Sequence, residues 1–373
     1  MKPLFIARSY PPSTGGMERF SDNLAIELAR MGPTMTIANR GGKRALPLFV
    51  PQAILAATLA ARRGRCDLIH LSDGLLAPAG ALLKKTTGLP VSATVHGLDL
   101  TFDNAAYQAM LSRTLVKLDR LIAVSESTRQ ICIERWPQLE SKMGVVPNGV
   151  NTDVEFGPPR DLPIDIAAAV HGKRMILTVG RLVERKGVAW FIQHALPLLP
   201  EDVVYLVAGE GPERDAIQRA VTLAGLGGRV RLLGRVTDRT LQALYSHADV
   251  FVMPNVVVDN DVEGFGLVAL EAAIRALPVV ASELQGIPEA IHDGANGFLV
   301  PPADAQAFVV KLEEVLDLTP RRRHNLGVRF QKYTQATFSW RRTAEAYWHE
   351  FERLANKDNI AAVVTGPALS KTF

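Results

Sequence analysis

The chain has 373 residues, of which 47% are hydrophobic and 21% are charged, and its formal net charge is +4. This composition is that of an ordinary globular protein and excludes disorder over most of the length. Because a single hydrophobic core usually stops growing at about 250–300 residues, the length predicts two domains.

The charge is unevenly distributed along the chain. Residues 1–150 carry 18 Lys and Arg against 11 Asp and Glu, whereas the remaining residues carry 24 against 27. A basic N-terminal half suits anionic lipid, an anionic acceptor or nucleic acid. Nucleic acid is the weakest of these, because the basic residues are scattered and no recognition motif occurs, so we expect no nucleic-acid partner.

The two cysteines, Cys66 and Cys132, predict neither a disulfide framework nor a zinc site, because no His/Cys cluster has metal-ligand spacing. The N-terminal residues MKPLFIARSYPP contain too short an apolar segment for a signal peptide and are typical of a first β-strand. We therefore expect a cytoplasmic protein.

Short apolar runs alternate with longer helical patterns in two series. The first series predicts strands at 3–7, 34–38, 67–71, 90–95, 120–124 and 143–146. The second predicts strands at 174–180, 203–209, 229–234, 249–254 and 278–282. Buried strands separated by helices predict an α/β fold with two parallel sheets. Ligands of such sheets bind beyond the carboxyl ends of the strands.

The segment 148–163 separates the two series, is rich in Gly, Pro and Asn, and is predicted to be an interdomain linker. We expect an N-terminal domain over 1–150 and a C-terminal domain over 164–337. The chain from 303 to about 357 is predicted to be helical. Its last helix, 338–357, carries aromatic side chains that need a surface to pack against. We expect that helix to pack back on the N-terminal domain.

The string EGFGLVALE, from Glu263 to Glu271, is the most informative stretch of the chain. A glycine-flanked turn that leads into a helix presents free N–H groups suited to a phosphate. Glu263 precedes the turn, and Glu271 lies about two helical turns further on. The pattern indicates sugar-nucleotide binding, although acids near a helix N-terminus also occur without any ligand.

The string GRLVERKG follows the predicted strand 174–180 and contains Arg181 and Lys186. Two cations just past a strand end suit a diphosphate, although surface charges on a loop would look the same. His96, in HGLD, also follows a strand, where it could serve a sugar hydroxyl or be structural. Gly15 and Gly16 follow the first strand and would let a ligand approach the backbone, or form a plain capped turn.

Six motifs in this order and spacing, GGMER, HGLD, PNGV, GRLVERKG, GEGP and EGFGLVALEA, resemble the retaining glycosyltransferases of family 4. The resemblance extends over nearly the whole chain. It implies the GT-B fold, in which two Rossmann-like domains with parallel sheets face a central cleft. The string DVEGFG, 261–266, is similar to mannosyltransferase-type members that use GDP-mannose, and a UDP-sugar stays open.

By this resemblance, Arg181 and Lys186 bind the donor diphosphate. Glu271 holds the ribose hydroxyls, Glu263 contacts the transferred sugar, and His96 lies near the C6 hydroxyl of that sugar. The remaining donor-binding positions implied by the resemblance lie in loops: Gly15 and Gly16 by the diphosphate, Gly209 and Gly211 near the nucleoside, Arg235 and Val236 beside the base, and Gly264, Phe265, Gly266 and Leu267 at the sugar and phosphate.

The sequence departs from the family pattern at two places. The string EAAIRALPVV, 271–280, lacks the Cys-Gly pair that often precedes the proline, and this change is expected to affect packing only. Gln285 stands where a glycine is usual, and Gly286 follows it. The second change is expected to leave the loop able to form but to alter how the loop fits the donor.

The implied reaction moves a hexose from a nucleotide-diphosphate sugar to a saccharide or lipid-linked acceptor, in cell-envelope glycan or glycolipid synthesis. A sugar-nucleotide epimerase on the same fold and a non-catalytic sugar-nucleotide-binding protein are the alternatives. Glu263 and Glu271 are assigned to hydroxyls, so we favour same-face displacement, in which the leaving phosphate accepts the acceptor's proton. No Asp-x-Asp motif follows a strand, so we expect no cofactor and no metal requirement.

The segment 46–65 has an apolar stretch that ends in three arginines. We expect it to be too short and too interrupted by proline to span a bilayer. It suits either an interfacial helix on anionic lipid, at the inner face of the cell membrane, or a buried helix of the first domain.

Overall fold

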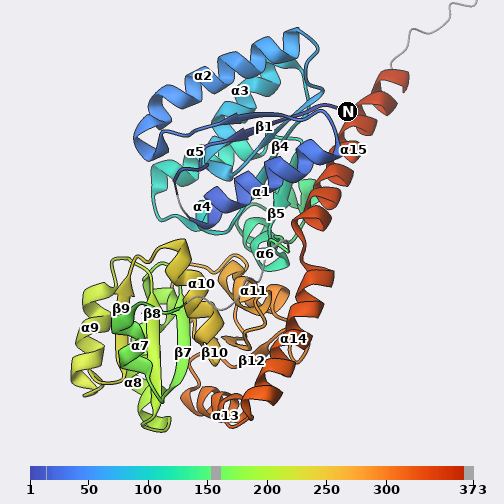
Figure 1. Ribbon diagram of the computed structural model, residues 1–373. Coiled ribbons are helices and arrows are strands. Elements are labelled where there is room, and N and C mark those ends of the chain that lie inside the picture. Colours follow the sequence, from blue (N-terminus) through green and yellow to red (C-terminus); the bar gives the residue numbers. More distant parts are fainter. Residues whose placement is uncertain (14, 153–160, 365–373) are drawn as a thin grey trace, which may run out of the picture. The chain divides into compact units, whose positions relative to one another are not determined.

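The computed structural model describes residues 1–13, 15–152 and 161–364, with only the backbone of 356–364. It consists of two compact units, one formed by Met1–Asn148 with Trp340–Phe373 and the other by Gly149–Ser339 (Figure 1). The boundary lies two residues before the expected end of the first domain. Part of the predicted linker, 153–160, lies outside the described residues.

The first unit contains a parallel sheet in the order β2-β1-β3-β4-β5-β6. Its strands are β1 (Pro3–Ala7), β2 (Met35–Ala38), β3 (Leu68–Leu71), β4 (Val91–Val95), β5 (Arg120–Ala123) and β6 (Met143–Val145). Its helices are α1 (Gly16–Met31), α2 (Gly42–Arg62), α3 (Ala77–Thr87), α4 (Leu98–Thr101), α5 (Ala105–Leu115), α6 (Glu126–Arg135) and α15 (Trp340–Val364), with 3-10 turns η1 (Gly74–Leu76) and η2 (Pro137–Lys142).

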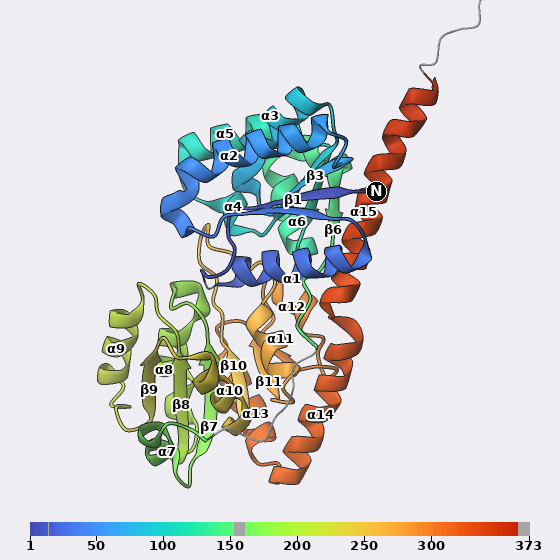
Figure 2. The same cartoon turned by 45° about the horizontal axis from the view of Figure 1, so that its top comes forward.

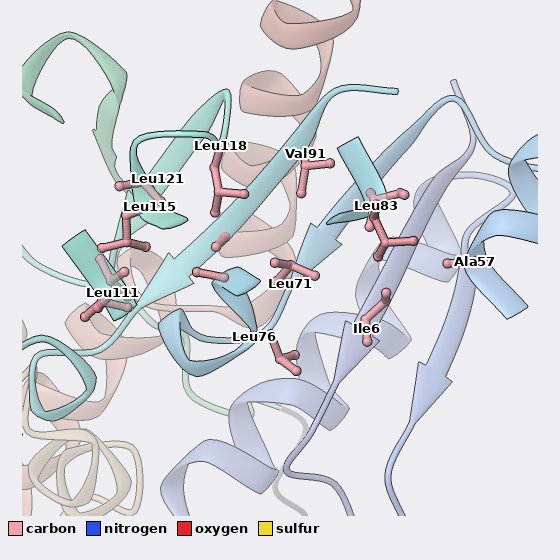
Figure 3. Close-up of a cluster of buried hydrophobic side chains, with 14 of the residues drawn as sticks. Ile6, Ala57, Leu71, Leu76, Leu83, Val91, Leu111, Leu115, Leu118 and Leu121 are labelled. Carbon is pink, nitrogen blue, oxygen red and sulfur yellow. The ribbon is translucent and has the colours of Figure 1, made fainter. Parts of the chain in front are cut away.

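Alternation along β1 divides the core of this unit into two layers. Leu4 and Ile6 face a cluster with α2, α3 and α5, which cover one side of the sheet (Figures 2 and 3). Phe5 and Ala7 face the opposite cluster, which contains residues of α1 and α15. Since successive side chains of a strand point to opposite faces, a fully apolar strand requires cover on both sides.

Helix α15 packs on the first unit through the aromatic face that the sequence indicates. Tyr347 is fully buried, and its hydroxyl lies 2.9 Å from the hydroxyl of Thr94 on β4. Thr94 in turn lies 3.1 Å from Nε2 of His70, a fully buried residue of β3. Burial, together with the nearby His96, lowers the pKa of His70 to about 3, so its imidazole is neutral in the folded protein.

The second unit contains a parallel sheet in the order β12-β11-β10-β7-β8-β9. Its strands are β7 (Arg174–Val179), β8 (Val203–Ala208), β9 (Val230–Gly234), β10 (Val250–Met253), β11 (Val279–Ser282) and β12 (Phe298–Val300). Its helices are α7 (Ile164–Val170), α8 (Val188–His194), α9 (Arg214–Leu223), α10 (Asp238–His247), α11 (Leu267–Ala273), α12 (Ile287–Ala290), α13 (Ala305–Leu316) and α14 (Pro320–Thr337), with 3-10 turns η3 (Glu184–Lys186) and η4 (Leu196–Leu198).

Helices α8, α9 and α13 share one buried cluster with alternate residues of β7, β8 and β10. On the other face Phe251 of β10 lies against Tyr245 of α10, with ring centroids 6.2 Å apart. The fold class predicted from the two series of apolar runs is therefore confirmed. The short edge strand β12 was not predicted, because its three residues lie in a glycine-containing turn region without strand-like alternation.

Most of the segment 46–65 lies in helix α2, one continuous helix of 21 residues that includes Pro47 and Pro51, so the prolines do not interrupt it. Among the described residues it is the one helix long and apolar enough to cross a membrane by length and composition. Phe49 and Ala53 pack into the core, whereas Leu48 and Leu55 are 71% and 61% exposed. The helix therefore has one buried and one exposed apolar face.

Candidate functional site

The order of the second sheet creates a switch point between β7 and β10. The chain builds outward from β7 through β8 and β9, and then returns to place β10 on the other side of β7. Ligands of open α/β sheets bind at such a switch point, beyond the carboxyl ends of the strands. Lys186 follows β7 and Glu263 follows β10.

Lys186 and Glu263 form a buried ion pair across this switch point. Nζ of Lys186 lies 2.5 Å from Oε2 of Glu263, and the residues are 8% and 9% exposed. Asn255 donates its side-chain N–H to the same Oε2 at 3.0 Å. Arg185 lies near as well, with Nε 3.5 Å from Oε2. This ion pair holds the side chain of Lys186 in place.

The charge state of Glu263 follows from these partners. Burial by itself raises the pKa of the carboxyl, but Lys186, Arg185 and the hydrogen bond from Asn255 outweigh it, and the pKa lies below its ordinary value. Glu263 is therefore ionised near neutral pH. Every hydrogen bond and ion pair of its carboxylate with the described part of the chain is made by Oε2, so Oε1 remains available as an acceptor.

The backbone of Glu263 is held by the turn after β11. Its N–H donates to Oε1 of Gln285 at 2.6 Å, and its C=O accepts from the N–H of Gly286 at 3.2 Å. A Cβ on Gly286 would lie 2.2 Å from the oxygen of Gly264, so only glycine permits this approach. The loop forms with Gln285 in place.

Glycines also bring the neighbouring strand-end loops close together. Gly187 has φ +64, and a Cβ there would lie 1.8 Å from the oxygen of Pro254. A Cβ on Gly209 would lie 1.8 Å from the oxygen of Gly180, and one on Gly211 would lie 2.0 Å from the oxygen of Leu182. The loops after β7, β8 and β10 are therefore in backbone contact, which fixes Lys186 against the strand ends.

The other predicted residues of this unit lie at the same edge of the sheet or in the helix that follows it. Arg181 is exposed at the end of β7 and makes no ion pair with the described residues. Glu271 is half-buried on α11, and its C=O accepts from Arg275. Arg235 is exposed and Val236 half-buried just after β9. Neither Arg181 nor Glu271 hydrogen-bonds to Lys186 or Glu263.

The turn from Gly264 to Leu267 joins Glu263 to α11. Gly266 has φ +88 and directly precedes the helix, whereas Phe265 is buried and lies against Phe338. Leu267 is the first residue of α11. Gly266 thus permits the left-handed backbone that precedes α11, while Phe265 anchors the turn.

In the first unit, the predicted residues follow β1 and β4. His96 is half-buried and its Nε2 lies 2.9 Å from the C=O of Ser72, so Nε2 donates and Nδ1 is the ring nitrogen that can serve a ligand. Its backbone N–H donates to Asp99. Gly15 and Gly16 are exposed at the start of α1.

Sequence reasoning missed several residues that the structure places in these clusters. Asn255 and Arg185 contact Glu263, and Gln285, which the sequence marked only as a departure from glycine, holds the backbone of Glu263. In the first unit, Arg8 donates to Asp73 at 2.7 Å across the switch point between β1 and β3. Asn255 and Arg8 stand within two residues of a strand end, so position alone could have identified them.

Two family models match the chain. The model described as "Glycosyltransferase Family 4" matches residues 14–154, and the one described as "Glycosyl transferases group 1" matches residues 173–317. Together they include His96 in the first unit and Lys186 and Glu263 in the second.

Several relatives are similar over most of their length. A GDP-mannose-dependent alpha-(1-6)-phosphatidylinositol monomannoside mannosyltransferase of Mycolicibacterium smegmatis is 26% identical over 91% of this chain and 95% of its own. An uncharacterized glycosyltransferase of Methanocaldococcus jannaschii is 28% identical over 85% and 89%. A phosphatidyl-myo-inositol mannosyltransferase of Mycobacterium leprae is 31% identical over 68% and 65%.

Solved structures share the fold at lower identity. HepE of Anabaena, in complex with UDP and glucose, has a TM-score of 0.73 and 20% identity over 95% of this chain and all of its own. Sucrose-phosphate synthase of Thermosynechococcus elongatus has a TM-score of 0.74 and 22% identity over 95% and 99%. Both comparisons support a GT-B architecture for this chain.

Proposed function

We propose that this chain, which belongs to glycosyltransferase family 4 and has the GT-B fold, moves a hexose from a nucleotide-diphosphate sugar to a saccharide or lipid-linked acceptor with retention of the anomeric configuration. The observation that carries the proposal is the buried Lys186–Glu263 pair at the switch point of the second sheet. The pair combines a cation that can bind phosphate with a carboxylate whose second oxygen can accept a hydrogen bond from a sugar hydroxyl.

Lys186 and Arg181 are assigned to the donor diphosphate. Arg181 is exposed and not engaged in an ion pair with the described residues, so its guanidinium is available for two parallel hydrogen bonds to phosphate oxygens. Lys186 is held in place by Glu263 and adds a second positive charge. These two charges offset the diphosphate, and we expect transfer to proceed without a divalent cation.

Glu263 is assigned to the transferred sugar, through Oε1, and Glu271 to the ribose hydroxyls. Because Oε2 of Glu263 already accepts from Lys186 and Asn255, the carboxylate is a poor nucleophile. In the proposed step the bond between the anomeric carbon and the diphosphate breaks as the acceptor oxygen bonds to the same face. The acceptor's proton passes to the departing phosphate oxygen, whose negative charge Lys186 and Arg181 stabilise.

The remaining donor contacts follow from position. Backbone groups of Gly264, Phe265, Gly266 and Leu267 face the sugar and phosphate. The loop with Gly209 and Gly211 serves the nucleoside, and Arg235 with Val236 serves the base. In the first unit, Gly15 and Gly16 serve the diphosphate, and Nδ1 of His96 accepts from a sugar hydroxyl.

The donor is proposed to be GDP-mannose, with a UDP-sugar as the alternative. The names of two mannosyltransferase relatives favour mannose, and the likeness to HepE, crystallised with UDP, favours the alternative. A thermal-shift screen of GDP-, UDP-, ADP- and dTDP-sugars distinguishes them, because a ligand of the folded state raises its stability. Lys186→Ala should abolish the shift, and absence of any shift in the native protein contradicts the donor site.

The reaction type is tested by analysing products with and without a saccharide acceptor. A transferase gives a new glycoside only when acceptor is present, with the configuration of the donor sugar kept. An altered sugar on the recovered nucleotide without acceptor would instead indicate an epimerase. Binding of the donor with neither product would indicate a non-catalytic protein.

The exposed face of α2 is proposed to contact anionic lipid, on the inner face of the cell membrane. Leu48, Leu55 and Leu59 are 71%, 61% and 40% exposed on this helix. Exposed cations flank it at both ends: Lys43, Arg44, Arg62, Arg63 and Arg65. No acidic residue occurs between Glu27 and Asp67. An apolar face bordered by cations suits a bilayer interface, and a lipid-linked acceptor would then lie near the enzyme.

A further inference from the structure

The turn between β11 and α12 holds Glu263 from a distant part of the chain. Oε1 of Gln285 accepts from the N–H of Glu263 at 2.6 Å, across 22 residues of sequence. The next residue, Gly286, donates its N–H to the C=O of Glu263 at 3.2 Å. Both backbone polar groups of Glu263 are therefore bound by two consecutive residues of one turn.

The chemistry of the contact identifies which end of the Gln285 amide is engaged. A backbone N–H can only donate, and the amide oxygen is the only acceptor on the glutamine side chain. The contact therefore depends on this oxygen, and a side chain of the same length without an acceptor cannot replace it.

The backbone of Gln285 indicates that the residue is not there for the turn alone. Its φ of +52 lies in the left-handed region, which is disfavoured for a residue with a Cβ. Glycine would adopt this conformation without steric strain but would leave the N–H of Glu263 without its acceptor. The hydrogen bond is what glutamine adds at this position.

We infer that Gln285 is a positioning residue that sets, through Glu263, how the enzyme holds the transferred sugar. Lys186 and Asn255 fix Oε2 of Glu263, and Gln285 fixes the backbone from which the carboxylate extends. Together these anchors determine where the free Oε1 points. The inference rests on the proposed assignment of Glu263 to the sugar.

Gln285→Met and Gln285→Gly test the inference, because both remove the amide oxygen that accepts from Glu263. The methionine keeps a side chain at this position, whereas the glycine does not. Each should lower kcat/KM for transfer from GDP-mannose, or from UDP-glucose, by about tenfold, the scale of leaving one partly buried N–H unsatisfied. Affinity for GDP and UDP, which carry no sugar, should fall less than transfer does, since Lys186 and Arg181 rather than Glu263 are assigned to the diphosphate. Equal losses of nucleotide affinity and transfer would overturn the positioning role.

A double-mutant cycle with Glu263→Ala separates this inference from the proposed function. If Gln285 acts through Glu263, adding Gln285→Met to Glu263→Ala should have no further effect on transfer. If the two substitutions lower transfer additively, the positioning role of Gln285 is contradicted, but the proposed function is not. Normal transfer by Glu263→Ala contradicts the proposed role of Glu263 and hence the premise.

Hydrogen exchange provides a readout that does not depend on the donor. The amide of Glu263 should exchange about tenfold faster in Gln285→Met than in the native protein, because its hydrogen bond is lost. Gln218→Met, an exposed change on α9, is the matched control and should leave this amide protected. Unchanged protection in Gln285→Met overturns the inference for any donor.

Discussion

Nζ of Lys186 lies 2.5 Å from Oε2 of Glu263, and these two residues come from loops on opposite sides of the switch point in the second sheet. The pair is buried, so each charge depends on the other. Removing one partner leaves the other charge buried and uncompensated, which is costly.

Lys186→Ala should therefore reduce transfer by about 10²-fold or more, the scale of losing one preorganised charge partner. Arg181→Ala should have a similar effect on transfer, but it should cost little stability because Arg181 is exposed. Steady-state kinetics and thermal unfolding measure both. Lys173→Ala, an exposed change at the opposite end of β7, is the control. Near-normal rates in both Lys186→Ala and Arg181→Ala would contradict the diphosphate assignment.

Transfer should continue in EDTA, because the charge of the leaving diphosphate is assigned to Arg181 and Lys186. The measurement compares initial rates after dialysis against EDTA with rates after adding back Mg²⁺ or Mn²⁺. A strict requirement for added metal would show that the two side chains do not suffice.

Binding to vesicles should depend on both the apolar face and the cations of α2. Flotation with phosphatidylglycerol vesicles should recover the protein at low salt, and recovery should fall as salt screens the charges. Leu55→Ser should weaken binding, whereas Leu223→Ser, at an 82% exposed site on α9, should not. Equal recovery on phosphatidylcholine and phosphatidylglycerol, or none on either, contradicts an anionic-lipid surface.

Acid should destabilise the first unit through His70. The pKa of the folded-state imidazole is lowered to about 3 from its ordinary 6.5, so only the unfolded state binds a proton between these values. As the pH falls from 6.5 toward 3, His70 should therefore lower the free energy of unfolding by about 1.4 kcal/mol per pH unit. Denaturant titrations of the native protein and His70→Gln from pH 7 to pH 4 measure the slope. An identical slope in the variant would contradict the neutral assignment.

Two glycines with nearly equal φ allow the cost of a steric clash to be measured separately from the cost of the backbone conformation. Gly187 has φ +64 and a Cβ there would lie 1.8 Å from the oxygen of Pro254, whereas Gly172 has φ +67 and open space around it. Gly172→Ala should cost about 1 kcal/mol of unfolding free energy from the φ penalty. Gly187→Ala should cost clearly more and also lower donor affinity, because Lys186 adjoins it. Equal costs would show that the loop relaxes freely.

The fold was predictable because its strands are mostly apolar and bounded by polar loops. The runs at 3–7 and 203–209 match β1 and β8 within one residue, since apolar side chains on both faces of a strand leave a clear pattern. The three-residue β12 leaves no such pattern. Lys186 and Glu263 were identified because each follows a strand within a motif.

Other site features could not be predicted from the sequence. Gln285 was identified only as a departure from glycine, because its hydrogen bond to Glu263 depends on tertiary contact across 22 residues. The exposed face of α2 depends on which side of the helix the sheet covers. The periodicity of an apolar helix with apolar residues on several sides does not determine this.

The order of the second sheet also determines when its site can form during folding. Lys186 precedes Glu263 by 77 residues, and β7 must be flanked by β10 before the two meet. A nascent chain that ends before β10 has the lysine but not its counter-charge. The pair is thus a contact of high sequence separation, and under the proposed function only a chain that has completed the whole unit can bind a donor.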